Sequence, residues 1–229
     1  MARPDPLLLL VTDRLRLARA VGAGDTDAPS LLLEQVRGAV AAGVDVVQVR
    51  ERDLESGALA ALVGAAVALA AGSRTRVVVN DRADVAIASG AAGVHLREDS
   101  IPTAAARRLL GAGAVVGRSV HDAAGAEAAG PVSYLLFGAV FETASKPGAT
   151  PAGTEGLARV VAAAGGRPVL ALGGITAANV GTVLRAGAAG VASIGAFLPA
   201  AGGGDNLVSE VKKMAFALRK GFDSAGSVP

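Results

Sequence analysis

The feature of this sequence that most constrains its fold is an eightfold alternation of short apolar runs with longer alanine-rich stretches. The runs are rich in β-branched residues and predict strands, whereas the stretches between them predict helices. Several runs are continuously apolar, which is typical of strands buried on both faces of a parallel sheet. The predicted strands are Leu7–Thr12, Val44–Val49, Arg76–Asn80, Gly93–Leu96, Ala114–Arg118, Ser133–Phe137, Pro168–Leu172 and Gly190–Ile194.

The longer stretches predict helices over Ser30–Ala42, Ser56–Ala71, Thr103–Leu110, Glu155–Ala164, Thr176–Ala186 and Asn206–Lys220. Within this set, Thr176 is predicted to cap its helix and Gly187 to end it. Residues 56–73 carry no charge, but their large apolar side chains fall on one helix face. This pattern favours a packed helix over a membrane span.

Successive strand–helix units in a chain of 229 residues predict a small (β/α)8 barrel of the α/β class. An open doubly wound sheet is the alternative. Against it, the first strand is followed by Thr12-Asp13-Arg14 rather than Gly-x-Gly-x-x-Gly, and the glycine-rich turns follow the last two strands. Since no linker divides the chain, we expect one barrel domain over residues 1–229, with a frayed tail from about residue 222.

Composition narrows the chemistry available to such a barrel. The chain has no Cys and only two His, which excludes thiolate nucleophiles and disulfides and favours oxygen ligands, hence magnesium, for any metal. The 3% aromatic content and net charge of +2 argue against a nucleic-acid partner. Without an export or lipidation motif we expect a cytoplasmic protein with no membrane partner, and a homo-oligomer stays open.

Polar side chains gather where the second and third predicted strands end, which is where barrel enzymes place their active sites. Gln48, Arg50 and Arg52 end the second strand, and arginine's forked donors suit phosphate oxygens. A solvated strand end is the alternative. Asn80 and Asp81 end the third strand, where the carboxylate could hold hydrated Mg²⁺ or simply cap a helix.

Both histidines follow predicted strands. Ser119 and His121 are two residues apart, so they point the same way and could face one small ligand together. Because imidazole titrates near neutral pH, His121 is the candidate for proton transfer. His95 lies inside an apolar run and is interpreted as a satisfied core residue.

The last three strand ends predict a phosphate site. The loop after the sixth strand contains Thr143, Ser145 and Lys146, and loops of this kind cover or clamp ligands. Glycine-rich turns after the seventh and eighth strands expose backbone N–H groups, as in a phosphate-binding barrel. Their candidate residues are Gly173, Gly174, Ser193, Ile194 and Gly195.

In order along the chain, these motifs resemble the thiamine phosphate synthase/TenI superfamily, whose members are (β/α)8 barrels in thiamine biosynthesis. The resemblance rests on Gln48-Val49-Arg50-Glu51-Arg52, Val79-Asn80-Asp81-Arg82, Gly93-Val94-His95-Leu96, Gly117-Arg118-Ser119-Val120-His121, the loop from Phe137 to Lys146, Leu172-Gly173-Gly174-Ile175 and the last glycine turn. It spans nearly the whole chain.

The resemblance implies one of two reactions. A synthase would join hydroxymethylpyrimidine pyrophosphate to a thiazole phosphate, with Mg²⁺ held by the residue matching Asp81 and a second Asp. Ser100 occupies that second position, although Asp99 is adjacent. In this reaction Arg50, Arg52, Asn80 and Lys146 would stabilise the departing pyrophosphate.

The motifs around Ser119-Val120-His121 and Phe141-Glu142-Thr143 look more like the TenI branch, the thiazole tautomerases. This implies that His121 takes the C2 proton of a thiazole carboxylate phosphate, that Ser119 orients the imidazole, and that no metal is needed. We therefore expect a tautomerase first and a magnesium-dependent synthase second. A non-catalytic sensor of a phosphorylated ligand is the third hypothesis.

Overall fold

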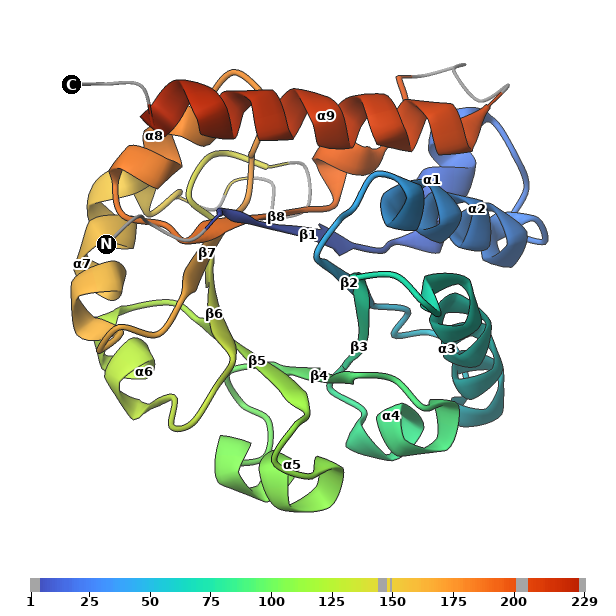
Figure 1. Cartoon of the computed structure of the whole chain (residues 1–229), viewed down its shortest axis with the longest axis horizontal. Helices are drawn as coiled ribbons and strands as arrows, with labels where there is room; N and C mark the ends of the chain where they lie inside the picture. The colour runs from blue at the N-terminus through green and yellow to red at the C-terminus, as the bar shows by residue number, and fades with distance from the viewer. Residues whose placement is uncertain (1–4, 144–147, 149, 201–205, 227–229) are drawn as a thin grey trace.

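Eight parallel strands form a closed barrel in the computed structural model, which describes residues 5–143, 148, 150–200 and 206–226 (Figure 1). Each strand pairs with the next along the chain, and β1 pairs with β8, for example Leu9 beside Ala192. The predicted fold class is confirmed. The strands are β1 (Leu7–Val11), β2 (Val46–Val49), β3 (Arg76–Asn80), β4 (Gly93–Leu96), β5 (Val115–Val120), β6 (Tyr134–Gly138), β7 (Val169–Leu172) and β8 (Gly190–Ser193).

Helices surround the barrel, as the crossover from each parallel strand to the next requires (Figure 1). They are α1 (Arg14–Val21), α2 (Ala28–Ala41), α3 (Ser56–Ala70), α4 (Ala83–Ser89), α5 (Thr103–Leu110), α6 (Ala123–Ala128), α7 (Gly153–Ala163), α8 (Val180–Arg185) and α9 (Leu207–Gly226), with a 3₁₀ turn η1 (Gly195–Phe197). Helices α1, α4 and α6 were not predicted from the sequence. These helices are short, and they offer few turns over which an apolar period could show.

The predicted start of α8 is wrong. The helix begins at Val180 rather than at Thr176. The side chain of Asn179 accepts a hydrogen bond from the N–H of Thr176 and donates another to the carbonyl of Gly174, so these residues form a turn instead of a first helical turn. The predicted end is right, because Gly187 lies just past the helix with φ of 102°.

Helix α9 lies across α2 and α8, near the junction of β8 with β1 (Figure 1). A Cβ on Gly38 of α2 would lie 2.8 Å from Cβ of Val211, so this glycine permits the close approach of the two helices. Near the end of α9, Arg219 donates to the carbonyls of Pro6 and Gly43, and Phe222 is buried. The helix therefore continues to Gly226, past the point from which we expected the tail to fray.

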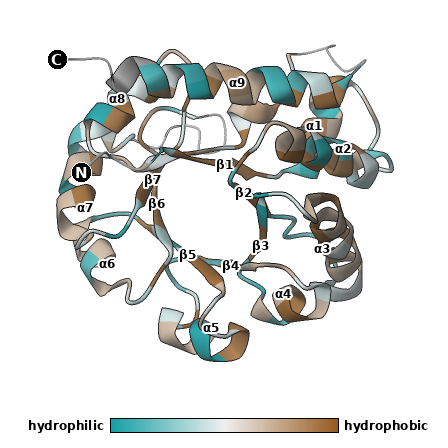
Figure 2. Ribbon diagram, in the orientation of Figure 1, coloured by the Kyte–Doolittle hydropathy of each residue, from teal (hydrophilic) through white to brown (hydrophobic). Residues whose placement is uncertain are grey.

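The core has an inner and an outer part. Leu9, Val78, Leu136 and Leu170 pack inside the barrel, and a larger cluster fills the space between strands and helices. α3 is almost uniformly apolar in Figure 2, whereas α9 alternates polar and apolar residues. Among the described residues, no helix is both long and apolar enough to span a membrane.

Candidate active site

A cavity of about 1080 Å³ opens at the carboxyl ends of the strands, and all eight strand–loop units contribute to its lining. The predicted site residues that line it are Gln48, Arg50, Arg52, Asn80, Ser119, His121, Thr143, Gly173, Gly174, Ser193, Ile194 and Gly195. Asp81 is not among the lining residues. Ser145 and Lys146 lie outside the described residues. The cavity thus collects most of the candidates, while their roles stay predictions.

Arg50 and Arg52 place two positive charges at the cavity after β2, and Asp13 and Glu98 are among the acidic residues that also line it. Within the described chain, neither guanidinium forms a hydrogen bond or ion pair with another residue. The pKa of Arg50 lies below its ordinary value, first because burial disfavours the charged form and then because Arg52 is nearby. Two neighbouring guanidiniums without a carboxylate partner form a site for an anion.

Beside these arginines, the amides of Gln48 and Asn80 are joined across β2 and β3. Nε2 of Gln48 donates to Oδ1 of Asn80 at 3.1 Å. Oε1 of Gln48 is buried and, in the described part of the chain, accepts no hydrogen bond. Since a buried acceptor without a partner is costly, this oxygen is available to a donor group on a ligand.

A buried ion-pair network anchors the loop that carries Arg50 and Arg52. The carboxylate of Glu51 accepts hydrogen bonds from the hydroxyl of Thr12 at 2.5 Å and from Nη1 of Arg14 at 3.1 Å. Arg14 also binds Asp53 through both terminal nitrogens. Glu51 and Arg14 are buried, so the network holds the chain on both sides of residue 52 rigidly against α1.

The turns after β7 and β8 expose backbone donors to the cavity. Gly173 and Gly174 have positive φ values of 99° and 64°. In the described chain, the N–H groups of Gly174 and Gly195 take no part in the turn and loop hydrogen bonds. The hydroxyl of Ser193 accepts from the N–H of Ala196 at 2.9 Å and so fixes the second turn. This geometry suits a phosphate group.

The two glycines also meet a packing requirement. A Cβ on Gly174 would overlap the carbonyl of Glu142, and one on Gly173 would lie 2.7 Å from Cα of Ala139. The loop after β6 therefore packs directly on the turn after β7. This close approach accounts for both glycines even without a ligand.

Ser119 and His121 face one cavity, as their spacing predicts, but Ser119 does not orient the His121 imidazole. Both line the cavity, but the hydroxyl of Ser119 lies 2.9 Å from Nε2 of His95. The imidazole of His121 is about half exposed, with Nδ1 3.1 Å from the carbonyl of Gly138 and Nε2 3.7 Å from Glu98. Because a carbonyl only accepts, Nδ1 of neutral His121 carries the hydrogen and Nε2 is left as a base.

His95 is buried, as expected of a core residue, yet it also lines the cavity. Its Nδ1 lies 3.2 Å from the hydroxyl of Tyr134, so both ring nitrogens have partners. Burial, and secondarily the charge of Arg50, lowers the pKa of His95 to about 3. The imidazole is therefore neutral at physiological pH.

The residues around Asp81 do not fit a magnesium site. Ser100 donates its hydroxyl hydrogen to one carboxylate oxygen of Asp81, and Nε of Arg97 lies 3.7 Å from the other. Arg97 also binds both carboxylate oxygens of Asp99, at 2.9 and 2.5 Å. Within the described ranges there is no group of three or more acidic or histidine side chains that could hold a metal. A guanidinium thus lies where a cation would bind.

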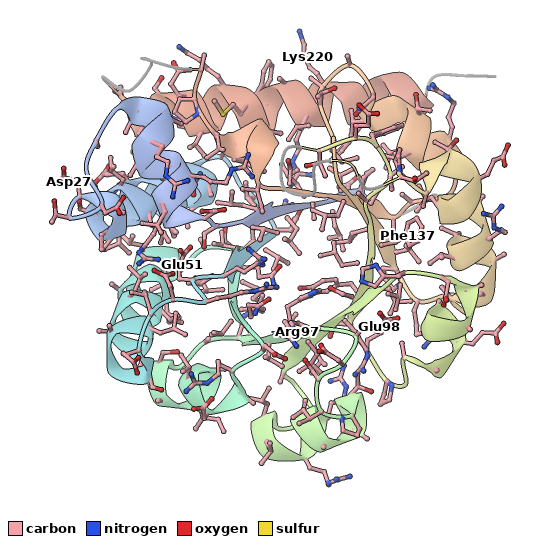
Figure 3. The ribbon with its side chains drawn as sticks, turned by 180° about the vertical axis from the view of Figure 1, so that it is seen from behind. Asp27, Glu51, Arg97, Glu98, Phe137 and Lys220 are labelled. Atoms are coloured by element: carbon pink, nitrogen blue, oxygen red, sulfur yellow. The ribbon has the colours of Figure 1, made fainter. Side chains whose placement is uncertain are left out.

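Some lining residues were not selected as site residues from the sequence. Asp13 and Arg16 follow β1, Arg97 and Glu98 follow β4, and Glu142 follows β6. Figure 3 labels Arg97 and Glu98 next to each other, on the segment that follows β4. The signal that could have found them is the position just after a strand, which applies to every unit of a barrel.

Comparisons with known proteins show which family has this barrel and cavity. The family model described as thiamine monophosphate synthase matches residues 23–197. The chain belongs to this family. A putative thiamine-phosphate synthase of Geobacter sulfurreducens is 43% identical over 201 residues, which cover 86% of this chain and 89% of the relative. The thiamine-phosphate synthase of Roseiflexus castenholzii is 38% identical over 197 residues, covering 85% and 82%.

A solved structure of this family also matches. Thiamine phosphate pyrophosphorylase from Pyrococcus furiosus superposes with a TM-score of 0.75 at 29% identity, covering 97% of this chain and 98% of that one. The family resemblance seen in the motifs is thus confirmed. These relatives bear the synthase name, so they favour the second of the two expected reactions over the tautomerase.

Proposed function

We propose that this member of the thiamine monophosphate synthase family is itself a thiamine phosphate synthase. It would couple hydroxymethylpyrimidine pyrophosphate to thiazole phosphate and release pyrophosphate. The observation that supports the proposal is that one cavity is lined in two places by groups suited to an anion, the Arg50–Arg52 face after β2 and the Gly174–Gly195 turns after β7 and β8. Two phosphorylated substrates need two such sites, and the names of the relatives agree with this reaction.

The spacing of the two anion sites suits a bond-forming reaction between their occupants. Only β1 separates β2 from β8 in the closed barrel. At ~4.8 Å between neighbouring strands, roughly 10 Å along the barrel wall separates β2 from β8 and roughly 14 Å separates β2 from β7. The two substrates would bind with their phosphate groups at these two places and their reacting atoms in contact within the cavity.

The chemistry asks the protein for charge stabilisation. The thiazole nitrogen attacks the methylene carbon of the pyrimidine, a C–N bond forms, and the C–O bond electrons leave with pyrophosphate. No proton has to move in this step. Arg50 and Arg52, held in place by the Glu51 network, donate to the oxygens on which negative charge grows. The Gly174 and Gly195 amides hold the thiazole phosphate.

A tautomerase is the second candidate, and two observations favour it. His121 lines the cavity with Nδ1 3.1 Å from the carbonyl of Gly138 and Nε2 3.7 Å from Glu98, which would stabilise an imidazolium formed by proton uptake. Asp81 is bound by Ser100 and is close to Arg97, and aromatising a thiazole carboxylate phosphate needs no metal. Proton transfer by a positioned base contributes about 10²–10⁴-fold.

Parallel assays of the purified protein separate these functions, each run with Mg²⁺ and with a chelator. The proposal predicts pyrophosphate release only when both synthase substrates are present, and a large loss of rate in Arg52→Ala. Arg37→Ala, an exposed residue of α2, is the matched control and should keep the full rate. The absence of pyrophosphate release under both conditions contradicts the proposal. If the wild type then aromatises the thiazole carboxylate phosphate and His121→Asn does not, the tautomerase is supported. If the protein binds these ligands without turnover, a sensor is supported.

A further inference from the structure

Three polar side chains form a chain of hydrogen bonds inside the barrel, on the strands farthest from β1. The hydroxyl of Tyr134 on β6 lies 3.2 Å from Nδ1 of His95 on β4. Nε2 of His95 lies 2.9 Å from the hydroxyl of Ser119 on β5. His95 and Tyr134 are each 2% exposed, whereas Ser119 is partly exposed at the cavity.

Gly117 provides the space in which these side chains meet. It pairs with His95 on one side and with Tyr134 on the other, so it lies between the two residues in the sheet. A Cβ at this position would overlap the Tyr134 ring and lie 2.6 Å from Nδ1 of His95. The two rings stack above this gap, with centroids 5.6 Å apart and planes inclined by 20°.

The protonation state of each group follows from its burial. The low pKa of His95, about 3, means that one ring nitrogen carries a hydrogen and the other accepts one. Burial raises the pKa of Tyr134, so the phenol keeps its hydrogen. The chain therefore contains neutral groups only, and its direction depends on where the phenolic hydrogen goes.

Tyr134 determines that direction. In the part of the chain that the structure describes, His95 is the one hydrogen-bond partner of its hydroxyl. If Nδ1 carried the imidazole hydrogen, the phenolic hydrogen would be buried without an acceptor, and the barrel would bear the full desolvation cost. The phenol therefore donates to Nδ1, and Nε2–H donates to the oxygen of Ser119. The hydrogen of the Ser119 hydroxyl is left to donate into the cavity.

We propose that Tyr134 and His95 are positioning residues that fix Ser119 as a hydrogen-bond donor to the substrate. β5 lies opposite β1 in the closed barrel, three strands from the Arg50–Arg52 face after β2 and from the Gly195 turn after β8, and two strands from the Gly174 turn after β7. The acceptor on the substrate is therefore a ring nitrogen of its uncharged heteroaromatic part. This assignment of the acceptor rests on the proposed function, whereas the direction of the hydrogen-bond chain does not.

The direction can be measured in the resting protein by nitrogen NMR. The chain has two histidines, so ¹⁵N-histidine labelling of His121→Asn leaves a single imidazole to observe. We expect the Nε2–H tautomer of His95, unchanged between pH 7.5 and 5, and a mixture of tautomers once Tyr134→Phe is added. An Nδ1–H tautomer, or protonation near pH 6.5, would overturn the inference whatever reaction the protein catalyses.

A double-mutant cycle tests whether Tyr134 acts through Ser119. Tyr134→Phe and Ser119→Ala should each lower kcat/KM for coupling by about three- to tenfold, as expected for one neutral hydrogen bond. The double variant should be no slower than Ser119→Ala alone. Effects that multiply would overturn the positioning role, because a structural effect of Tyr134 persists without Ser119. Urea unfolding of each variant checks that it is folded. If coupling is absent in the wild type, the proposed function fails while the NMR result stands.

Discussion

The buried, neutral imidazole of His95 makes the stability of the barrel depend on pH. The folded pKa of about 3 lies below the ordinary value near 6.5 because burial and Arg50 disfavour the charged ring. The unfolded chain therefore takes up a proton that the folded chain does not. Stability from this residue is fully present above pH 6.5 and is lost as pH falls toward 3.

Uptake of one proton by the unfolded chain lowers the free energy of unfolding by about 1.4 kcal/mol per pH unit once the pH is well below 6.5. Between pH 7.5 and 5 the integrated loss is about 2 kcal/mol. For a chain of this size, 1 kcal/mol shifts Tm by about 2–4 °C, so Tm should fall by about 4–8 °C from this group alone.

Urea unfolding at several pH values between 7.5 and 5, for wild type and His95→Gln, isolates the effect. Carboxylates that titrate in this range are common to both proteins and cancel in the difference. Between pH 7.5 and 5, the free energy of unfolding of the wild type should fall by about 2 kcal/mol more than that of His95→Gln. His121→Asn, which alters a half-exposed imidazole, is the matched control and should keep the dependence of the wild type. Parallel curves for wild type and His95→Gln would refute a neutral buried His95.

Three further predictions follow from the described contacts. Glu51→Ala leaves the guanidinium of Arg14 buried beside one exposed carboxylate, so it should lower the free energy of unfolding in urea by about 3 kcal/mol. Glu34→Ala, which removes an exposed ion pair with Arg37, is the control and should change this free energy by less than ~0.5 kcal/mol. Gly174→Ala adds a side chain at positive φ against Glu142, so it should lower the free energy of unfolding by about 1–3 kcal/mol and weaken phosphate binding measured by calorimetry. Gly64→Ala, whose added methyl group meets open space beside α3, is the control and should leave stability unchanged or raise it. Titration of the resting protein with MgCl₂ should give no binding heat, and saturable binding abolished by Asp81→Asn would contradict the arrangement of Arg97 and Ser100.

The alternation of apolar runs was enough to place all eight strands within two residues, because strands buried on both faces leave an unbroken apolar signal. Helices were harder where they are short, as in α6, or where a side chain competes with the backbone, as Asn179 does before α8. Most of the candidate residues predicted from the strand ends also line the cavity. The sequence could not show which residues these side chains form hydrogen bonds or ion pairs with.

Ser119 shows why the partners were missed. Period two places it on the same face as His121, but the register of β4 with β5 and the space above Gly117 bring His95 to it first. Register between neighbouring strands is a tertiary property that a single strand does not carry. The same holds for Arg97, whose partly exposed side chain lies between Asp81 and Asp99.

Simultaneous binding of two phosphorylated ligands tests most directly whether the cavity has two anion sites. Pyrophosphate is titrated calorimetrically into the protein alone and into the protein saturated with thiazole phosphate. Two anion sites in one cavity predict that pyrophosphate binds in both experiments with similar affinity, and that Arg52→Ala weakens it in both. If saturation with thiazole phosphate abolishes pyrophosphate binding, the two ligands compete for one site, and the two-substrate account is contradicted.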